Sequence, residues 1–305
     1  MGGSMLDSGA AVPRSYERRT AKMDLPECPQ CKFQGAASVH WRAPRFLRCR
    51  ECGTIFRDPF PGESELANYY REGWKEPEEN VVETGSTDGV IARYLADSLT
   101  DTLALRSLSG MRILDFGAGR GAMTLELMKR GAKLVAVEPF GYKFLAELGI
   151  SVYRDLAHLP DELTFDGIVS LETIEHLRDP GGVLAGLYKR LSPGGWLLIT
   201  TPNAAGLPAR LMGQHWREAV KPGHIVFFTP AALSKILEKN GFSQVQRPRW
   251  FIRYPRASPL RALLHFGLQK LAIDGGLRMV AYRRQTKLPT ADLLAEQGGK
   301  RALPE

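Results

Sequence analysis

An apolar segment that runs into a glycine-rich loop most strongly constrains the fold of this 305-residue chain. Residues 113–121 read Ile-Leu-Asp-Phe-Gly-Ala-Gly-Arg-Gly. Glycine tolerates positive φ and lets a ligand approach the backbone, and residues 122–130 have the pattern of a helix whose first N–H groups would face that ligand. The segment predicts a strand, a nucleotide-cofactor loop and a helix. It also satisfies the dinucleotide pattern G-x-G-x-x-G/A, so the loop alone does not identify the cofactor.

Further apolar segments follow at the spacing of an α/β fold. The second predicted strand, 133–137, ends at Glu138, 23 residues after Asp115. A carboxylate at that distance can accept hydrogen bonds from ribose hydroxyls. The other predicted elements are strands over 150–153, 165–170 and 196–201, a helix over 183–191 and a turn over 192–195. Strands that alternate with helices predict a parallel sheet.

In this order the segments resemble the class I S-adenosylmethionine-dependent methyltransferases, and within them the branch of the ubiquinone-pathway O-methyltransferases. The resemblance covers roughly residues 90–250 and is carried by Asp-Phe-Gly-Ala-Gly-Arg-Gly, Glu138, Asp155, Phe-Asp-Gly-Ile-Val-Ser, Glu-Thr-Ile-Glu-His-Leu and Leu-Ser-Pro-Gly-Gly. It implies a Rossmann-like seven-stranded sheet with helices on both faces, and S-adenosyl-L-methionine as cofactor. The last two strands, expected over 249–253 and 277–283, would form an antiparallel pair.

The resemblance also implies the cofactor-binding residues. Glu138 is expected to hold the ribose, and Asp155 to approach the adenine amino group. The full implied set is Asp115, Gly117, Ala118, Gly119, Glu138, Pro139, Asp155, Leu156 and Leu171. Asp115, Gly117 and Gly119 would surround the methionine part of the cofactor. Two alternatives stay open, because Asp115 could cap the following helix and Asp155 could be an ordinary turn aspartate.

A Glu-x-x-Glu-His segment supplies the candidate catalytic residues Glu172, Glu175 and His176, and His224 follows 48 residues after His176. If the segment is helical, positions i, i+3 and i+4 share one face. The pattern resembles the metal site of methyltransferases that modify the terminal ribose of small RNAs. Glu172, Glu175, His176 and His224 would then hold magnesium or manganese. In the other interpretation the histidines line the acceptor pocket without metal and one of them acts as a general base.

Two Cys-x2-Cys pairs precede the glycine loop. Cys28 and Cys31 are separated by 17 residues from Cys49 and Cys52, and these are the only cysteines in the chain. This spacing predicts a four-cysteine ribbon that holds a structural zinc ion, with no open coordination position. Thiolate ligands favour a reducing, cytoplasmic setting. A redox pair and two disulfides are the alternatives.

The ribbon and the segment after it resemble the leader of bacterial methyltransferases that act on sugars and secondary metabolites. Tyr69, Tyr70 and Trp74 of this segment could cover an acceptor or pack against the core. The predicted organisation is a disordered tail (1–24), the zinc ribbon (25–60), a helical linker or lid (61–90), the methyltransferase domain (91–285) with a helical insertion (258–272), and a flexible tail (286–305).

Charge is concentrated at the two ends of the chain, which has a formal net charge of +8. Residues 1–60 carry 10 basic and 6 acidic side chains, and residues 251–305 carry 10 and 4, whereas the part between is nearly neutral. This distribution only weakly favours RNA as substrate. An RNA methyltransferase and a non-catalytic binding protein are therefore the alternatives to an enzyme that methylates a small molecule on oxygen or carbon.

The sequence leaves the acceptor open among secondary metabolites, sugars and quinone-like compounds. It predicts an amphipathic helix over 259–271 that could act as a lid, touch a membrane or a lipid substrate, or pack at the domain edge or a dimer interface. The chain could be a monomer or a homodimer.

Overall fold

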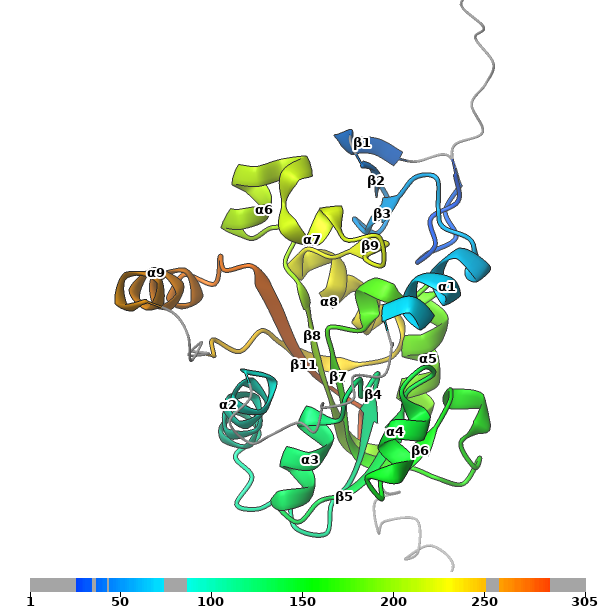
Figure 1. Ribbon diagram of the computed structural model, residues 1–305, viewed down its shortest axis with the longest axis vertical. Coiled ribbons are helices and arrows are strands. Elements are labelled where there is room, and N and C mark those ends of the chain that lie inside the picture. The colour runs from blue at the N-terminus through cyan, green and yellow to red at the C-terminus, as the bar shows by residue number, and fades with distance from the viewer. Residues whose placement is uncertain (1–25, 35–36, 43, 74–86, 251–257, 286–305) are drawn as a thin grey trace, which may run out of the picture.

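A computed structural model describes residues 26–34, 37–42, 44–73, 87–250 and 258–285, which form two β-sheets and the helices around them (Figure 1). The two predicted tails and Trp74 lie outside the described residues. Among the described helices, none combines the length and apolar character needed to cross a membrane.

The larger sheet has seven strands, as predicted. Their spatial order is β6 (Ser151–Tyr153), β5 (Lys133–Val137), β4 (Arg112–Phe116), β7 (Phe165–Leu171), β8 (Leu191–Pro202), β11 (Gly276–Tyr282) and β10 (Ser243–Gln246). The first five are parallel, and β11 is antiparallel to both β8 and β10. Because β4 and β7 are parallel neighbours, their carboxyl ends lie side by side.

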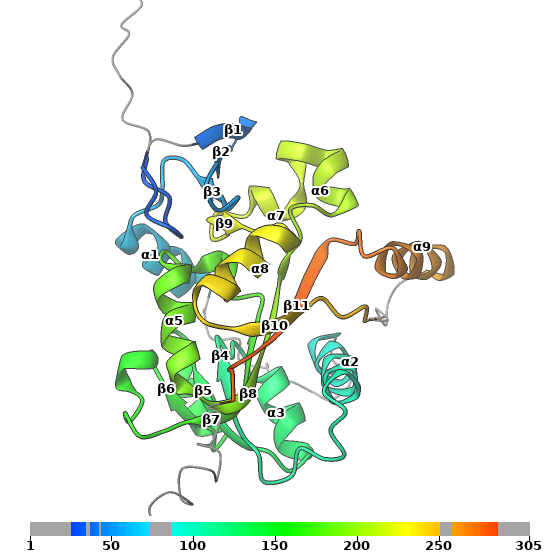
Figure 2. The same ribbon diagram turned by 180° about the vertical axis from the view of Figure 1, so that it is seen from behind.

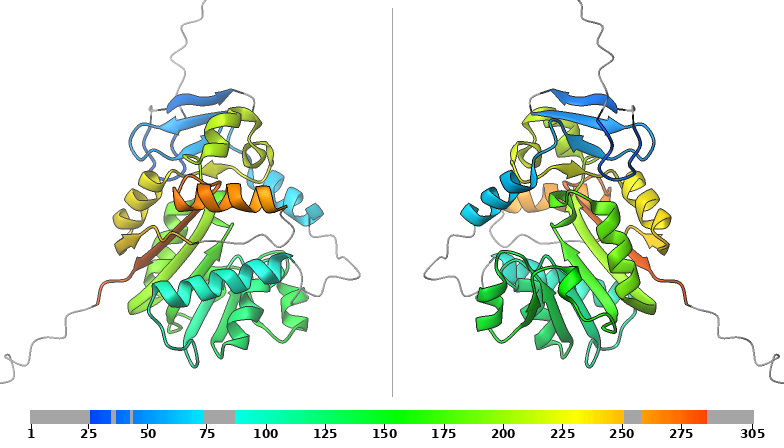
Figure 3. Two further views of the ribbon diagram at one scale, coloured as in Figure 1. Left: turned by 90° about the vertical axis from the view of Figure 1, so that its left-hand side faces the viewer. Right: turned by 90° about the vertical axis from the view of Figure 1, so that its right-hand side faces the viewer.

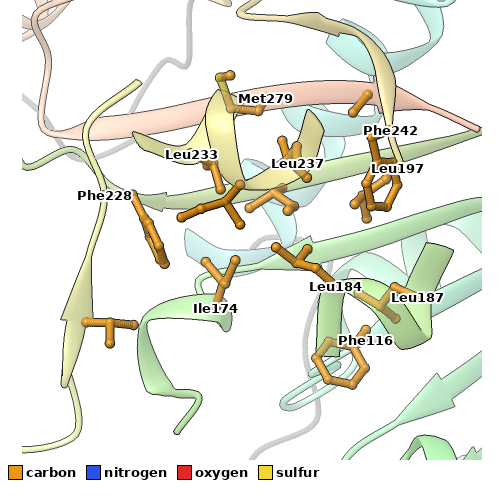
Figure 4. Packing of buried hydrophobic residues seen from close by; sticks show 14 of the residues in the cluster. Phe116, Ile174, Leu184, Leu187, Leu197, Phe228, Leu233, Leu237, Phe242 and Met279 are labelled. Carbon is orange, nitrogen blue, oxygen red and sulfur yellow. The ribbon is translucent and has the colours of Figure 1, made fainter. Parts of the chain in front are cut away.

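Helices cover both faces of this sheet because side chains alternate along each strand (Figures 1 and 2). On one face, Leu197 and Ile199 of β8 pack with α5 (Pro180–Arg190) and α8 (Pro230–Lys239). Figure 4 shows the leucines of these two helices directed at the sheet. On the other face, Leu198 packs with α2 (Thr87–Thr102) and α3 (Ala122–Lys129). A further helix, α4 (Tyr142–Glu147), covers β5.

Two predictions, one of a strand and one of a turn, need correction. The sixth strand is Ser243–Gln246, not 249–253, and of the predicted segment residues 251–253 lie outside the described residues. The predicted turn over 192–195 is wrong, because β8 already begins at Leu191 and shifts its register against β7 between Phe165 and Gly167. The seventh strand is confirmed.

The smaller sheet joins the cysteine ribbon to a distant part of the chain. Strands β1 (Ala37–Arg42), β2 (Arg45–Cys49) and β3 (Ile55–Arg57) are antiparallel neighbours, and β3 also pairs with β9 (Val226–Phe227). Their buried aromatic side chains pack with Trp216 in one cluster. The ribbon is thus fixed to the segment that contains His224.

The remaining elements lie around the carboxyl edge of the larger sheet (Figure 3). They are α1 (Glu63–Gly73), η1 (Leu156–His158), η2 (Ile174–His176), α6 (Leu207–Met212), η3 (Gly213–His215), α7 (Arg217–Val220) and α9 (Pro259–Lys270). The helix predicted over 259–271 is confirmed. Ser258 caps its N-terminus by accepting a hydrogen bond from the Arg261 N–H, and Pro259 occupies the first turn.

Candidate active site

The glycine loop after β4 lies against the segment after β7. Gly117, Gly119 and Gly121 have φ of 78°, 54° and 79°. A Cβ built on Gly117 would lie 2.3 Å from Thr173 Oγ1, whereas a Cβ on Gly119 would meet no atom within 4 Å. Gly117 therefore allows the two segments to touch, and Gly119 leaves open space beside the backbone.

Glu138 at the end of β5 holds this loop. Its Oε2 accepts a hydrogen bond from Gly119 N at 2.9 Å, and its Oε1 accepts from Phe140 N and Gly141 N at 3.0 and 3.3 Å. Burial raises the pKa of Glu138, although these backbone bonds oppose the shift. Because each carboxylate oxygen has two lone pairs, Oε2 retains one that can accept a ligand hydroxyl.

Asp115 lies behind the loop. It is 2% exposed, and its Oδ2 accepts a hydrogen bond from Thr124 Oγ1 in α3 at 2.6 Å. Burial raises the pKa of Asp115 to about 6. This bond ties Asp115 to a side chain of α3, whose N-cap is Gly121, and the contact of Asp115 with a cofactor stays a prediction.

The residues predicted to lie near adenine follow β6. Asp155 Oδ1 accepts hydrogen bonds from Ala157 N and His158 N at 2.9 and 3.1 Å, so Asp155 caps η1. Leu156 and Leu171 are both half-buried. The cap agrees with the turn-aspartate alternative and leaves the adenine contact untested.

Three of the four predicted catalytic residues converge. One ligand atom each of Glu175, His176 and His224 lie within 4.8 Å of one another. The two imidazole rings are 4.7 Å apart and nearly perpendicular. Glu172 is not in this group: its φ is 49°, and the segment continues as the short 3₁₀ helix η2 instead of the expected α-helix. The Glu172 carboxylate accepts a hydrogen bond from Thr200 Oγ1 instead.

The hydrogen bonds around His176 fix its tautomer. Tyr70 Oη donates to Gly223 O at 2.9 Å and lies 2.7 Å from His176 Nδ1, which is itself 2.9 Å from Gly223 O. An unprotonated Nδ1 would place two acceptors against each other, so Nδ1 carries the proton. Nε2 therefore holds the lone pair. Burial lowers the pKa of His176, yet 27% of its side chain is exposed.

Glu175 is fully buried beside His176. Its Oε2 accepts a hydrogen bond from Thr201 Oγ1 at 2.9 Å, whereas its Oε1 has no hydrogen-bond partner among the described residues. His176 Nε2 lies 3.9 Å from that oxygen. Burial, together with repulsion from Glu172, holds the pKa of Glu175 well above its usual range. The free oxygen thus faces the imidazole.

His224 completes the group from the segment before β9. It is 6% exposed, and its Nδ1 lacks a hydrogen-bond partner within the described part of the chain. The nearest carboxylate oxygen, Glu218 Oε2, is 3.6 Å away. Burial, assisted by repulsion from His176, lowers the pKa of His224 to about 2, so its imidazole is neutral.

A family described as a methyltransferase domain matches residues 91–247, which include the glycine loop, Glu138 and all three converging residues. The chain belongs to this family. The match, the sheet order and the loop agree with the resemblance to class I S-adenosylmethionine-dependent methyltransferases.

Curated relatives of this methyltransferase carry the name ubiquinone biosynthesis O-methyltransferase. The Rattus norvegicus protein is 31% identical over 159 residues, which cover 45% of this chain and 46% of its own length. The Aeromonas salmonicida protein is 31% identical over 153 residues, with 44% and 63% covered. Among solved structures, a SAM-dependent methyltransferase from Archaeoglobus fulgidus aligns with a TM-score of 0.46 and 20% identity over 63% of this chain and 94% of its own. The chain spans about half the length of the curated relatives it matches.

Sequence reasoning missed the partners of His176. The sequence allowed two roles for Tyr70, covering an acceptor or packing against the core. Nothing in the sequence links it to a histidine 106 residues away. Gly223 contributes only its carbonyl oxygen, which no residue-type pattern reveals. A Cβ on Gly223 would lie 2.8 Å from Tyr70 Oη, so glycine is needed there for this packing.

The four ribbon cysteines of the methyltransferase fit the predicted zinc site. All are free thiols, and their sulfurs lie within 4.8 Å of one another. The Cys28–Cys52 and Cys31–Cys49 sulfur distances are 3.6 and 3.7 Å. Zn–S bonds of about 2.3 Å in a tetrahedron require sulfurs about 3.8 Å apart. The arrangement would hold zinc with four protein ligands, and zinc itself stays a prediction.

Replacing Glu138 tests the cofactor loop. We expect Glu138→Ala to weaken S-adenosylmethionine binding by about 1.5–3 kcal/mol, because the loop loses its anchor and the ligand loses an acceptor. Calorimetry measures the change, with exposed Glu147→Ala in α4 as the control. Unchanged affinity, or tight NAD binding by the wild type, would contradict the assignment.

Metal analysis tests the ribbon. Reduced, freshly purified protein should contain about one zinc per chain. Cys49→Ser should lower the zinc content and the unfolding temperature of the ribbon while S-adenosylmethionine binding persists, because Glu138 and Thr173, which lie outside the ribbon, hold the cofactor loop. Arg50→Ser, an exposed neighbour, is the control. Protein without zinc would overturn the assignment.

Proposed function

We propose that the chain transfers a methyl group from S-adenosylmethionine to a hydroxyl of a small-molecule acceptor. The contact between Gly117 and Thr173 carries this proposal, because it joins the cofactor loop to the segment that holds Glu175 and His176. The relatives named as ubiquinone biosynthesis O-methyltransferases support oxygen as the methylated atom.

The residues at the loop fit this cofactor. Gly119 has open space beside its backbone, and the buried Glu138 retains a lone pair for a hydroxyl. We assign the ribose to Glu138, the methionine part to residues 117–119, and the adenine to the surroundings of Asp155 and Leu156. When bound, S-adenosylmethionine supplies an electrophilic methyl group on a sulfonium.

His176 is the general base of the proposal. Its Nε2 lone pair accepts the proton of the acceptor hydroxyl, because Nδ1 already carries a proton that Gly223 O and Tyr70 Oη hold in place. A pKa below the usual value keeps this lone pair free at neutral pH. General-base catalysis of this kind contributes about 10² to 10⁴ in rate.

His224 and Glu175 shape the surroundings of that base. Neutral His224 packs its ring against His176 and adds no charge. Burial raises the pKa of Glu175, which disfavours the charged form of this carboxyl group beside the imidazoles. The acceptor thus meets an uncharged, half-buried imidazole. The orientation of acceptor and base supplies the rest of the catalysis.

A cation at the same residues is the competing assignment. Two imidazole nitrogens and one carboxylate oxygen form a donor set that suits zinc or manganese better than magnesium, because Glu172 is not among the converging atoms. Two buried atoms of this group, Glu175 Oε1 and His224 Nδ1, have no hydrogen-bond partner among the residues that the structure describes, which favours the cation. The tautomer of His176 is the same in both assignments.

The pH dependence tests the base. The acceptor is first found by screening phenols, sugars and quinols. With this acceptor, kcat/KM should be constant around neutral pH and should decrease at acid pH with an apparent pKa lower than about 6.5, because protonated His176 cannot accept a proton. His176→Ala should lower kcat by about 10² to 10⁴ and abolish this titration. A profile that His176→Ala leaves unchanged would exclude His176 as the base.

Tyr70→Phe separates positioning from catalysis in the same assay. The variant keeps the ring but loses one of the two acceptors for Nδ1–H, so we expect kcat to fall by about tenfold, KM to change little and the acid limb to move to lower pH. Tyr69→Phe, on the adjacent residue, should leave the profile unchanged.

Chelation distinguishes base from cation. The protein is treated with EDTA under conditions in which metal analysis still finds about one zinc per chain, the zinc of the ribbon. This treatment should leave methyl transfer intact if His176 acts alone. Loss of activity that added manganese, magnesium or zinc restores would establish the cation instead.

A further inference from the structure

Helix α9 turns its apolar side chains toward solvent. Leu260, Leu263 and Leu264 are 78%, 69% and 59% exposed, whereas Gln269 is only 3% exposed. A helix that packs at the edge of a domain normally buries its apolar stripe and exposes its polar face. Helix α9 instead exposes these leucines together with Arg261 and Lys270, so the three leucines contribute little burial to the described fold.

The body of the protein fixes this orientation. Directly after α9, Ile273 O accepts a hydrogen bond from Leu207 N at 2.6 Å, and Ala272 O accepts one from Arg247. Asp274 pairs with Arg278 of β11 at 2.9 Å. The helix is therefore held at its C-terminal end, and Figure 3 shows it lying across the outside of the molecule, next to α6.

Helix α6 begins beside the residues that follow α9, where Leu207 N donates to Ile273 O, and it carries further exposed apolar side chains. Leu211 and Met212 at its end are 75% and 48% exposed, and Leu271 after α9 is 67% exposed. We call the combined set the α6–α9 surface; it consists of Leu211, Met212, Leu260, Leu263, Leu264 and Leu271, with the exposed cations Arg210, Arg261 and Lys270.

Charge distinguishes the occupants that could cover this surface. Neither α6 nor α9 contains an aspartate or a glutamate. In a two-fold dimer through this surface the same patch meets itself, so the cations of one copy would face those of the other with no acid on either helix. A bilayer with anionic headgroups complements both features, because it accepts leucines below the headgroups and attracts arginine and lysine at their level.

We propose that the α6–α9 surface docks the protein on a membrane surface that contains anionic lipid. The leucines of α9 enter the boundary of headgroups and acyl chains, and Arg210, Arg261 and Lys270 contact lipid phosphates. Lys270 can reach the headgroups because its long stem lies along apolar surface while its ammonium stays in water. This inference is independent of the proposed function.

Vesicle flotation of the full chain tests the inference. Wild-type protein should float with vesicles of equal parts phosphatidylcholine and phosphatidylglycerol, float less with phosphatidylcholine alone, and dissociate as salt is added. The double variant Leu260→Asp/Leu263→Asp should bind the anionic vesicles about tenfold or more weakly. Lys270→Glu should also weaken binding, by about fivefold.

Matched substitutions on α3 control for surface changes elsewhere. Met128→Asp and Lys129→Glu alter an exposed methionine and an exposed lysine that lie outside the α6–α9 surface, and should leave flotation unchanged. All variants should keep the wild-type S-adenosylmethionine affinity and unfolding temperature. The inference is wrong if wild-type protein does not float, if the α3 variants lose binding equally, or if the leucine variants instead convert a dimer to a monomer in sedimentation.

Discussion

The neighbouring position of β4 and β7 in the larger sheet determines the candidate site. The chain leaves β4 toward β5 and β6 on one side and later returns to β7 on the other, so the two strand ends form a topological switch point, the place at which open α/β sheets bind their ligands. The loops after these strands touch at Gly117 and Thr173, where any side chain larger than hydrogen on residue 117 would collide. Cofactor loop and candidate base are therefore adjacent although they are distant in sequence.

The N-terminal ribbon and helix contribute to the same site. β3 pairs with β9, and Arg57 donates hydrogen bonds to Ala219 O and Lys221 O, so the ribbon supports the segment that leads to His224. Helix α1 supplies Tyr70, which holds Nδ1 of His176. The matched methyltransferase region, residues 91–247, includes His176, Ala219 and Lys221. Arg57 and Tyr70, which contact these residues, lie outside it. The N-terminal ribbon and α1 thus help to position the imidazole rings of His176 and His224.

The central strands could be predicted because their apolar runs are long and buried on both faces, as in β4 and β5. The sixth strand could not: Ser-Gln-Val-Gln at the sheet edge has little apolar pattern, whereas the segment around Trp250 reads like a strand. Edge strands depend on pairing with a neighbour, here β11, which local sequence does not encode.

The site was predictable in its residue types but not in its geometry. Helical spacing placed Glu172 beside His176, whereas a positive φ at Glu172 and a single 3₁₀ turn leave only Glu175 with the histidines. Tyr70 and Gly223 act through a hydroxyl and a carbonyl oxygen that meet only in three dimensions. Long-range pairing of this kind requires the fold.

Hydrogen–deuterium exchange with and without saturating S-adenosylmethionine tests most directly whether the two loops form one site. We predict slower amide exchange on cofactor binding both in residues 117–121 and 138–141 and in residues 171–176, with no change in α9. Protection confined to other parts of the chain, or protection of the glycine loop without any change after β7, would contradict this prediction.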